Sequence, residues 1–517
     1  MATLDQRRSG IVLHPTSLPG PHGSGDFGPA AYHFIDWLAA AGQSVWQVLP
    51  LTPIGPGNSP YASVSAFAGN PLLVALEPLL EKKWLPPIAT HEVASFNPRR
   101  VDFDGAMNWR MNRLRAAAQG FFGKAGADDR AAFADYCGAQ ASWLDDFALF
   151  MALDTSLRAR SIESWPQWDM QLARRDAQAL AAARREHAAE VDFWRFTQWC
   201  FDTQWSALMR YAHERGVRIV GDLPIFIAHH SADCWARPDL YLLDQNFAPT
   251  VIAGVPPDFF SPTGQRWGNP LYDWTAMKRD GFAWWIARAR RQLALADLVR
   301  IDHFRGFAGY WEIPSSCPTA MEGRWVDAPG IALFEAMRAA LGDLPVIAED
   351  LGVITPDVEQ LRDAFAFPGM RILQFGFNGD ADHAFLPHNY VPNCVVYTGT
   401  HDNDTVRGWF DSATQRERDY ACAYLDTDPH NVHWAMLRGV LGSVAKLAMA
   451  QFQDVLGLDG RHRMNVPGQI DCWTWRFTWD MVGPEPAARL AALSAAYGRA
   501  PMEKLNLAAW PANRTRP

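Results

Sequence analysis

The sequence lacks the cysteine patterns that mark a metal site or a disulfide framework. Seven cysteines are scattered over 517 residues, and no two of them form a Cys-x-x-Cys pair. Zinc sites and disulfide scaffolds both depend on closely spaced cysteines. His229 and His230 follow a predicted strand, but no third ligand stands at metal spacing from them. We therefore predict no metal site, and reduced thiols fit a cytoplasmic location.

Long basic runs and long apolar runs are also missing. The formal net charge is -9, and no cluster of Lys or Arg interrupts the chain. Proteins that bind nucleic acid or anionic lipid present basic surfaces, so neither partner is indicated. The first ten residues have no signal-peptide core, and no later apolar run is long enough to span a bilayer. We expect a cytoplasmic protein that binds neither nucleic acid nor membrane.

The sequence motifs of nucleotide-binding proteins and of serine hydrolases do not support either of these two classes. No phosphate-binding loop with its lysine occurs, and no Gly-x-Ser-x-Gly turn occurs. Gly23-Ser-Gly25-Asp-Phe-Gly28 matches the dinucleotide-binding pattern, but the next strand, Val45–Pro50, ends without the acidic residue that would bind a ribose. We therefore expect no cofactor.

What the sequence does contain is a repeated strand-then-helix pattern. The hydrophobic fraction of 49% is enough for a large core. Short apolar, β-branched runs are each followed by a turn signal and a helical pattern, which is typical of βα units with a parallel sheet. Eight such runs predict an α/β fold, a (β/α)8 TIM barrel. They are Ile11–Leu13, Val45–Leu49, Arg218–Ile227, Leu298–Phe304, Val346–Asp350, Arg371–Phe375, Val395–Thr400 and Lys446–Leu456.

The uneven spacing of these strands predicts a barrel interrupted by large, mainly helical insertions. We expect one catalytic domain over residues 1–517, with a mainly helical subdomain over 51–216. A second insertion, over 228–296, contains a Gly/Pro-rich loop, Gly254–Gly264, that excludes regular structure and suits a lid. Helices are expected in the rest of that insertion.

Four of the apolar runs end in an acidic residue: Asp222, Asp302, Glu349-Asp350 and Asp402. The carboxyl ends of all barrel strands open onto one face, so these acids converge there. An acid at a single strand end is more often a turn residue or a helix cap, but four together favour an active site.

Two of these acids stand in contrasting surroundings. Arg300 and Asp302 point the same way along their strand, so the guanidinium is expected to lower the pKa of Asp302, as suits a nucleophile; an ordinary ion pair is the alternative. Glu349 lies in an apolar strand context that raises a carboxyl pKa, as a general acid requires. Two carboxyl groups with opposed environments are the usual arrangement of a glycosidase. His303 and His401 beside them suit sugar-hydroxyl donors.

The longer motifs resemble one family, the 4-alpha-glucanotransferases called amylomaltase or disproportionating enzyme, glycoside hydrolase family 77. The resemblance runs nearly end to end, and motifs of this length in this order are highly specific. They are Leu13-His-Pro-Thr-Ser-Leu-Pro-Gly20, Trp46-Gln-Val-Leu-Pro-Leu51, Ser59-Pro-Tyr61, Ser65-Ala-Phe-Ala-Gly-Asn-Pro71, Gly221-Asp-Leu-Pro-Ile-Phe226, Gly264-Gln-Arg-Trp-Gly-Asn-Pro270, Arg300-Ile-Asp-His-Phe-Arg-Gly306, Ala348-Glu-Asp-Leu-Gly352, His401-Asp-Asn-Asp-Thr405 and Asn465-Val-Pro-Gly468.

This resemblance implies a role for each candidate residue. Asp302 would be the nucleophile, Glu349 the general acid and base, and Asp402 the third carboxylate, which grips sugar hydroxyls. The family commonly has Tyr where this chain has Phe259, a departure that bears on donor or acceptor preference. The residues implied to contact substrate are Tyr61, Asp222, Asp258, Phe259, Gln265, Trp267, Arg300, His303, His401 and Asn465.

The implied reaction transfers part of an alpha-1,4-glucan or maltooligosaccharide to glucose or another glucan through a covalent glycosyl-enzyme. Two alternatives remain open. One is an amylase-like hydrolase with the same three carboxyl groups, which differs only in letting water replace the acceptor. The other is a glucan-binding protein without catalysis, and the presence of all three acids argues against it.

Overall fold

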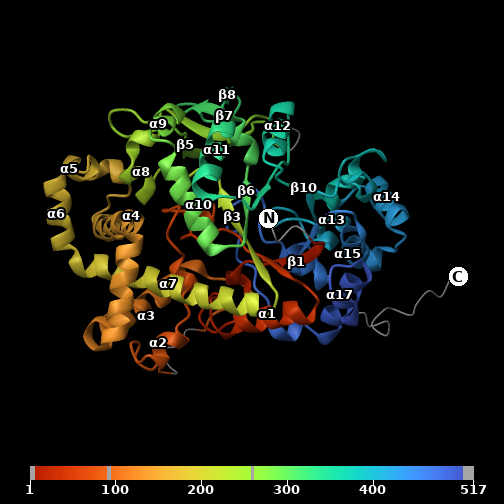
Figure 1. The fold of residues 1–517 in the computed structure, drawn as a ribbon, viewed down its shortest axis with the longest axis horizontal. Helices are drawn as coiled ribbons and strands as arrows, with labels where there is room; N and C mark the ends of the chain where they lie inside the picture. The colour runs from red at the N-terminus through yellow and green to blue at the C-terminus, as the bar shows by residue number, and fades with distance from the viewer. Residues whose placement is uncertain (1–5, 90–94, 258–260, 505–517) are drawn as a thin grey trace.

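A barrel of eight parallel strands forms the centre of the molecule (Figure 1). We describe residues 6–89, 95–257 and 261–504 of this computed structural model. The strand order is β10-β11-β12-β1-β2-β3-β6-β9, and the two ends meet where Ala348 N donates to Pro368 O at 2.9 Å. The predicted TIM barrel is thus confirmed. Its strands are β1 (Arg8–Val12), β2 (Val45–Gln47), β3 (Arg218–Pro224), β6 (Leu298–Asp302), β9 (Val346–Ala348), β10 (Gly369–Ile372), β11 (Cys394–Tyr397) and β12 (Leu447–Gln451).

The barrel interior changes from apolar to charged along the strands. Alternate residues of each strand point inward, so Val220 and Leu298 fill the core while Asp222 and Arg300, two residues further on, lie nearer the carboxyl end. A packed apolar layer thus supports a layer of charges. The apolar layer contains Val12, Val45, Val220, Leu298, Ile347, Met370, Ile372, Val395, Tyr397, Leu447 and Met449.

Helices surround this barrel and connect successive strands (Figure 1). The connection from β10 to β11 is an exception, since its described residues form only the short turns η9 (Leu373–Asn378) and η10 (Pro387–Asn389). Apart from those of the insertions described below, the helices that follow these strands along the chain are α1 (Pro29–Ala40), α7 (Ala188–Glu214), α10 (Ala283–Leu295), α11 (Gly330–Leu341), α12 (Pro356–Ala364), α13 (Val406–Ser412), α14 (Gln415–Leu425), α15 (Val432–Gly442), α16 (Phe452–Val455) and α17 (Pro484–Ala496).

Most of the chain between β2 and β3 forms helices that extend to one side of the barrel, on the left in Figure 1. Long aromatic and aliphatic side chains of α4 and α7, among them Phe147 and Trp194, are buried between them. The helices of this segment that precede α7 are α2 (Glu77–Glu81), α3 (Phe103–Lys124), α4 (Ala127–Arg158), α5 (Met170–Ala173) and α6 (Ala177–Glu186).

A four-stranded antiparallel sheet, ordered β5-β4-β7-β8, adjoins the barrel. The prediction for residues 228–296 contained helices and a loop but no strands, whereas two strands of this sheet lie there. The chain in β5 reads Gln-Arg-Trp-Gly-Asn-Pro, without the alternation that marks a strand. The strands of this sheet are β4 (Val251–Val255), β5 (Gln265–Pro270), β7 (Gly309–Pro314) and β8 (Arg324–Asp327). Two short helices, α8 (Ala232–Ala236) and α9 (Trp274–Arg279), lie in the same part of the chain.

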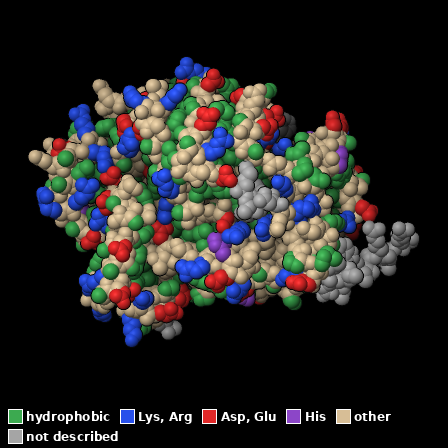
Figure 2. All heavy atoms as spheres, in the orientation of Figure 1, with side chains coloured by type: hydrophobic (Ala, Val, Ile, Leu, Met, Phe, Trp, Pro, Cys, Tyr) green, Lys and Arg blue, Asp and Glu red, His purple; other side chains and the backbone are tan. Residues whose placement is uncertain are grey.

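The surface carries charges of both signs. Figure 2 shows Lys and Arg side chains interspersed with Asp and Glu over one face of the molecule. Among the helices formed by the described residues, none has the length and apolar character needed to cross a membrane.

The loop that matched the dinucleotide-binding pattern has a packing role. A Cβ on Gly25 would lie 2.1 Å from Pro15 O, so the close approach that requires this glycine is to the chain itself. Asp26 Oδ1 accepts from Gly28 N at 2.9 Å, and Asp26 Oδ2 accepts from the buried Arg110 guanidinium at 2.9 Å. The loop is therefore occupied by protein partners.

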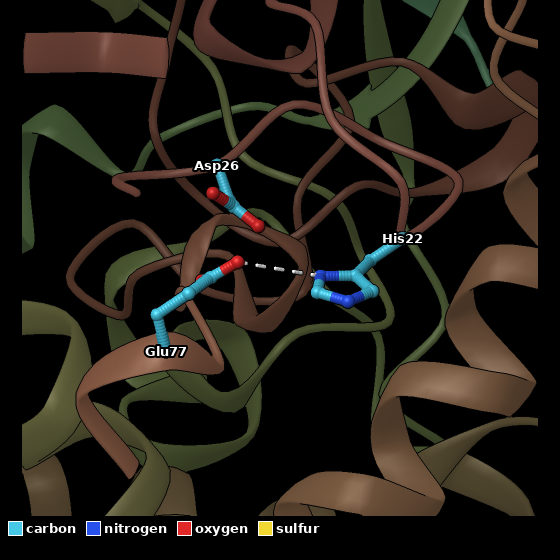
Figure 3. A group of neighbouring side chains, drawn as sticks. All are labelled: His22, Asp26 and Glu77. Carbon is cyan, nitrogen blue, oxygen red and sulfur yellow. Dashed lines mark ion pairs between the residues drawn. The ribbon is translucent and has the colours of Figure 1, made fainter. Parts of the chain in front are cut away.

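His22, Asp26 and Glu77 form the one cluster with metal-ligand chemistry in the described part of the chain (Figure 3). His22 Nδ1 lies 3.9 Å from Glu77 Oε1. Burial and the charge of Arg110 lower the pKa of His22, and burial together with Asp26 raises the pKa of Glu77. Because Arg110 already balances Asp26, the charge of this cluster does not favour an added cation.

Arg110→Met is expected to lower the free energy of unfolding by about 3–5 kcal/mol, because it leaves the Asp26 carboxylate buried without its cation. Arg110 is fully buried and also donates to Val74 O at 2.6 Å. Arg115 on the same helix pairs with Glu190 in a partly exposed position, so Arg115→Met is a matched control, with a loss of no more than about 1 kcal/mol. Denaturant unfolding measures both, and equal losses would contradict the prediction.

Candidate active site

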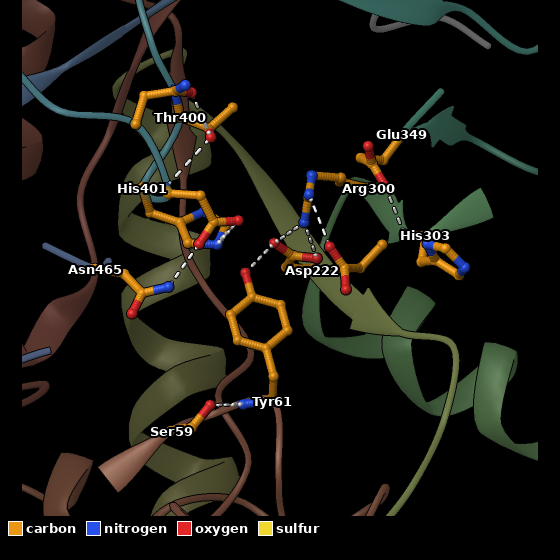
Figure 4. Close-up of polar contacts among 12 residues, drawn as sticks. Ser59, Tyr61, Asp222, Arg300, His303, Glu349, Thr400, His401 and Asn465 are labelled. Carbon is orange, nitrogen blue, oxygen red and sulfur yellow. Dashed lines mark hydrogen bonds and ion pairs between the residues drawn. The ribbon is translucent and has the colours of Figure 1, made fainter. Parts of the chain in front are cut away.

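The predicted acids meet at the carboxyl end of the barrel (Figure 4). Asp222 and Asp302 lie within the last residues of β3 and β6, Glu349 follows β9 directly, and Asp402 lies in the loop after β11. Each acid comes from a different strand, as expected for a barrel site.

Arg300 stands at the centre of this group. Its NH1 donates to both oxygens of Asp222, at 2.8 and 2.7 Å, and its NH2 donates to Asp302 Oδ1 at 2.8 Å. Tyr61 OH also donates to Asp222 Oδ2, at 2.8 Å. Asp222 has no exposed side-chain surface. Asp222 therefore fixes the positions of Arg300 and Tyr61, and the substrate contact implied for it stays a prediction.

Arg300 acts to lower the pKa of Asp302, as predicted, but the expected low pKa of this group is wrong, because the net shift is a rise. Burial raises the pKa of Asp302 to about 6; Arg300 opposes this rise, and the charges of Asp222 and Asp402 add to it. Arg300 shares its charge with Asp222, so it compensates only part of the cost of burying Asp302. At neutral pH Asp302 is still mainly ionised.

Glu349 is held by backbone donors at both oxygens. His303 N donates to Oε2 at 2.7 Å, and Leu351 N donates to Oε1 at 3.0 Å. His303 has a φ of 51°, a left-handed conformation that is costly for a residue with a Cβ and that aims this N–H at Glu349. Burial raises the pKa of Glu349 to about 8, against the charge of Arg300 and with that of Asp302. The expected rise is confirmed.

Asp402 has the opposite electrostatic environment. Burial acts to raise its pKa, but His401 and the hydrogen bond from Asn465 outweigh burial and hold the pKa well below its ordinary range. Asn465 Nδ2 donates to Asp402 Oδ1 at 2.6 Å, and His401 Nε2 lies 3.3 Å from Oδ2. Two residues predicted to bind sugar therefore contact Asp402 itself.

Aromatic rings border the acids. Tyr61 stacks on His401 with ring centroids 5.2 Å apart, and Trp473 lies 5.7 Å from Tyr61. Trp473 was not among the predicted residues, because one tryptophan among 23 carries no distinguishing signal in the sequence. Its φ of 68° places the ring in this group by a strained backbone.

The other predicted contacts lie on the β5 side. Trp267 is 38% exposed, and its ring meets that of His303 edge-on at 4.8 Å. Trp267 Nε1 donates to Gln265 Oε1 at 3.2 Å, so both side chains share one face of β5. Asp258 and Phe259, predicted in the lid loop, lie outside the described residues.

His229 and His230 have structural partners. His229 Nε2 lies 2.8 Å from Phe247 O, and His230 Nε2 lies 2.8 Å from Asp154 Oδ1. His230 Nδ1 also accepts from Trp165 N at 3.2 Å. These contacts join α4 and its neighbouring loops, away from the acids described above.

A barrel that gathers a glutamate and two aspartates from different strands beside an arginine at its carboxyl end has the arrangement of an enzyme acting on glycosidic bonds. A family model described as 4-alpha-glucanotransferase matches residues 13–481. The chain belongs to this family, glycoside hydrolase family 77, and is an enzyme of the glycosyltransferase type. The resemblance found in the sequence motifs is thereby confirmed.

Individual relatives agree with this assignment. A 4-alpha-glucanotransferase of Thermus thermophilus is 49% identical over 95% of this chain and 99% of its own length. One of Synechocystis is 46% identical over 96% and 99% of the two chains. Among solved structures, an amylomaltase of Streptococcus agalactiae in complex with acarbose superposes with a TM-score of 0.91 at 37% identity, covering 96% of this chain and all of that one.

Proposed function

We propose that the enzyme transfers alpha-1,4-glucan segments by double displacement, with Asp302 as nucleophile and Glu349 as acid and base. Asp302 Oδ forms a bond to the anomeric carbon while the bond from that carbon to the glycosidic oxygen breaks. Glu349 gives its proton to the leaving oxygen. A 4-hydroxyl of glucose or another glucan then returns a proton to Glu349, attacks the anomeric carbon and releases Asp302.

One observation carries this assignment: Arg300 NH2 donates to Asp302 Oδ1 at 2.8 Å, whereas both oxygens of Glu349 accept from backbone N–H groups, and burial raises the pKa of Glu349 further than that of Asp302. Near pH 7 one carboxyl group holds the proton that the leaving oxygen needs and the other carries the negative charge that the attack needs. Asp402, with its low pKa, stays ionised and suits a grip on sugar hydroxyls. Arg300, His303, His401 and Tyr61 border the same space and are proposed to line the subsite around the reacting sugar.

Incubation with maltotriose, without added metal or nucleotide, tests the proposal. Transfer yields glucose and longer maltooligosaccharides with little net gain of reducing ends, and it identifies glucose as an acceptor when labelled glucose enters the longer products. Only shorter products with rising reducing ends would make the enzyme a hydrolase. Unchanged maltotriose would contradict the proposal and favour a protein that binds glucan without catalysis.

The pH dependence of kcat/KM is expected to be bell-shaped, with limbs near pH 6 and pH 8. Activity falls below about pH 6 as Asp302 takes up a proton, and it falls above about pH 8 as Glu349 loses its proton. Initial rates of glucose release from maltotriose between pH 4.5 and 9.5 measure the profile. A rate that stays constant from pH 7 to 9.5 would contradict the role of Glu349.

We further propose a cytoplasmic location. All seven cysteines are free thiols, and three of them, Cys200, Cys234 and Cys394, are buried in the core. A protein with this many unpaired cysteines suits a reducing compartment.

A further inference from the structure

The segment 398–405 carries His401 and Asp402 between the end of β11 and the start of α13. It has no regular structure, so its shape depends on contacts with its neighbours. Gln374 Nε2 and Gln451 Nε2 both donate to Asp404 O, at 2.9 and 3.0 Å. Arg463 NH2 donates to Asp402 O at 2.5 Å. These contacts hold the middle of the segment.

Both ends of the segment meet at a single side chain, that of Asp454. Thr398 Oγ1 donates to Asp454 Oδ2 at 2.6 Å, and Val406 N donates to Asp454 Oδ1 at 2.7 Å. Asp454 lies on α16, directly after β12, and is 1% exposed. One carboxylate therefore fixes the distance between the start of the segment and the first residue of α13.

Stability of the fold alone does not account for this carboxylate. Burial raises the pKa of Asp454 to about 7; the hydrogen bonds from Thr398 and Val406 lower it, and the nearby charge of Asp404 raises it. A carboxyl group buried beside another acid costs stability. The hydrogen bonds of the Asp454 side chain go to Thr398 and Val406 and not to Asp302, Glu349 or Asp402. Any effect of Asp454 on the reaction therefore passes through the segment that it holds.

We propose that Asp454 is a positioning residue for glucan transfer: by tying Thr398 to Val406 it sets the place of Asp402 and His401 beside the reacting sugar. The proposal rests on the role proposed for Asp402. A displacement of about 1 Å in such a group is enough to lower the rate about a hundredfold.

The first test compares Asp454→Ala with Asp454→Asn in the full chain. Alanine removes the tether, and kcat for maltotriose is expected to fall between about tenfold and a hundredfold, with KM within about threefold of wild type. Asparagine keeps the tether, because its carbonyl accepts from Val406 N and its amide donates to Thr398 Oγ1. We expect its kcat within about threefold of wild type. An equal loss of kcat in both variants would contradict the proposed role of Asp454 as a tether.

Asp297→Ala is the matched control. Asp297 also accepts a backbone N–H, from Ile219 at 2.8 Å, and its side chain is 15% exposed. It lies at the amino end of β6, the end of a barrel that serves stability rather than catalysis. This variant is expected to lower the melting temperature and leave kcat within about twofold of wild type. A loss of kcat equal to that of Asp454→Ala would show a general effect of removing a buried acid and overturn the proposal.

The Asp402→Asn background separates the two proposals. If Asp454 acts mainly through Asp402, adding Asp454→Ala there should lower the residual rate by a clearly smaller factor than it does in the wild-type background. If the rate of the double variant is lowered by the product of the two single-variant factors, the positioning role is contradicted. Wild-type activity of Asp402→Asn would instead remove the role proposed for Asp402.

Thr398→Val covers the case in which Asp454→Ala does not fold. It deletes one arm of the tether with little change of volume, and kcat is expected to fall about fivefold; the melting temperature falls because Asp454 Oδ2 loses its donor, but by less than in Asp454→Ala. A wild-type kcat in a folded Thr398→Val protein would overturn the proposal.

Discussion

Asp302→Asn is expected to lower the rate of maltotriose disproportionation by about ten-thousandfold or more. An amide does not form the covalent bond to the anomeric carbon on which the proposed reaction depends. The loss should appear in kcat, because the hydroxyl-binding groups remain. Product chromatography over a long incubation measures it. A rate within about tenfold of wild type would remove Asp302 as nucleophile.

The fold should survive this substitution. Arg300 keeps both hydrogen bonds to Asp222, and the new amide oxygen can accept from Arg300 NH2. The folded-state pKa of Asp302, about 6, lies above its ordinary value of 3.8, so the folded state holds more protons than the unfolded state between these values, and stability falls as pH rises through that window. Asparagine removes this loss, and the variant should be at least as stable as wild type above pH 6. Asp480→Asn makes the same substitution at an exposed position and is the control for effects of producing and measuring a variant protein.

The barrel could be predicted because its strands carry a local signal. All eight predicted runs overlap a strand of the barrel, since β-branched apolar residues between turn signals leave few alternatives. The ends were predicted less well. The run Lys446–Leu456 was extended through α16, because Phe452 and Val455 continue the apolar pattern into the helix. Two strands of the antiparallel sheet lack a recognisable pattern, since β8 is largely exposed and β5 does not alternate, whereas β4 and β7 contain buried apolar residues and were overlooked.

The acids of the site were also predicted, but their interactions were not. Strand ends locate Asp302 and Glu349, whereas the link from Tyr61 to Asp222 spans 161 residues and that from Asn465 to Asp402 spans 63. Such pairs depend on how the connecting segments fold back over the barrel, which no local pattern specifies. The error for Asp302 has the same origin, because the second partner of Arg300 comes from another strand.

Glu349→Ala is expected to lower disproportionation of maltotriose by about a thousandfold, because the leaving oxygen then departs without a proton. Alanine is preferred to glutamine here. Both carboxyl oxygens of Glu349 accept from backbone N–H groups, so the amide of a glutamine would face one of these donors. With α-maltosyl fluoride, whose leaving group needs no proton, formation of the glycosyl-enzyme should lose less than about tenfold. Equal losses with both substrates would contradict the acid role.

Azide distinguishes the two carboxyl roles through the anomeric configuration of its product. In Glu349→Ala, azide needs no general base and attacks the glycosyl-enzyme on Asp302, so two inversions give an α-maltosyl azide. In Asp302→Ala, azide takes the place of the missing carboxylate and attacks α-maltosyl fluoride directly, so one inversion gives the β-azide. NMR of the anomeric proton separates the products. If the configurations were exchanged, Glu349 would be the nucleophile and Asp302 the acid, although the pKa order of the two groups opposes that assignment.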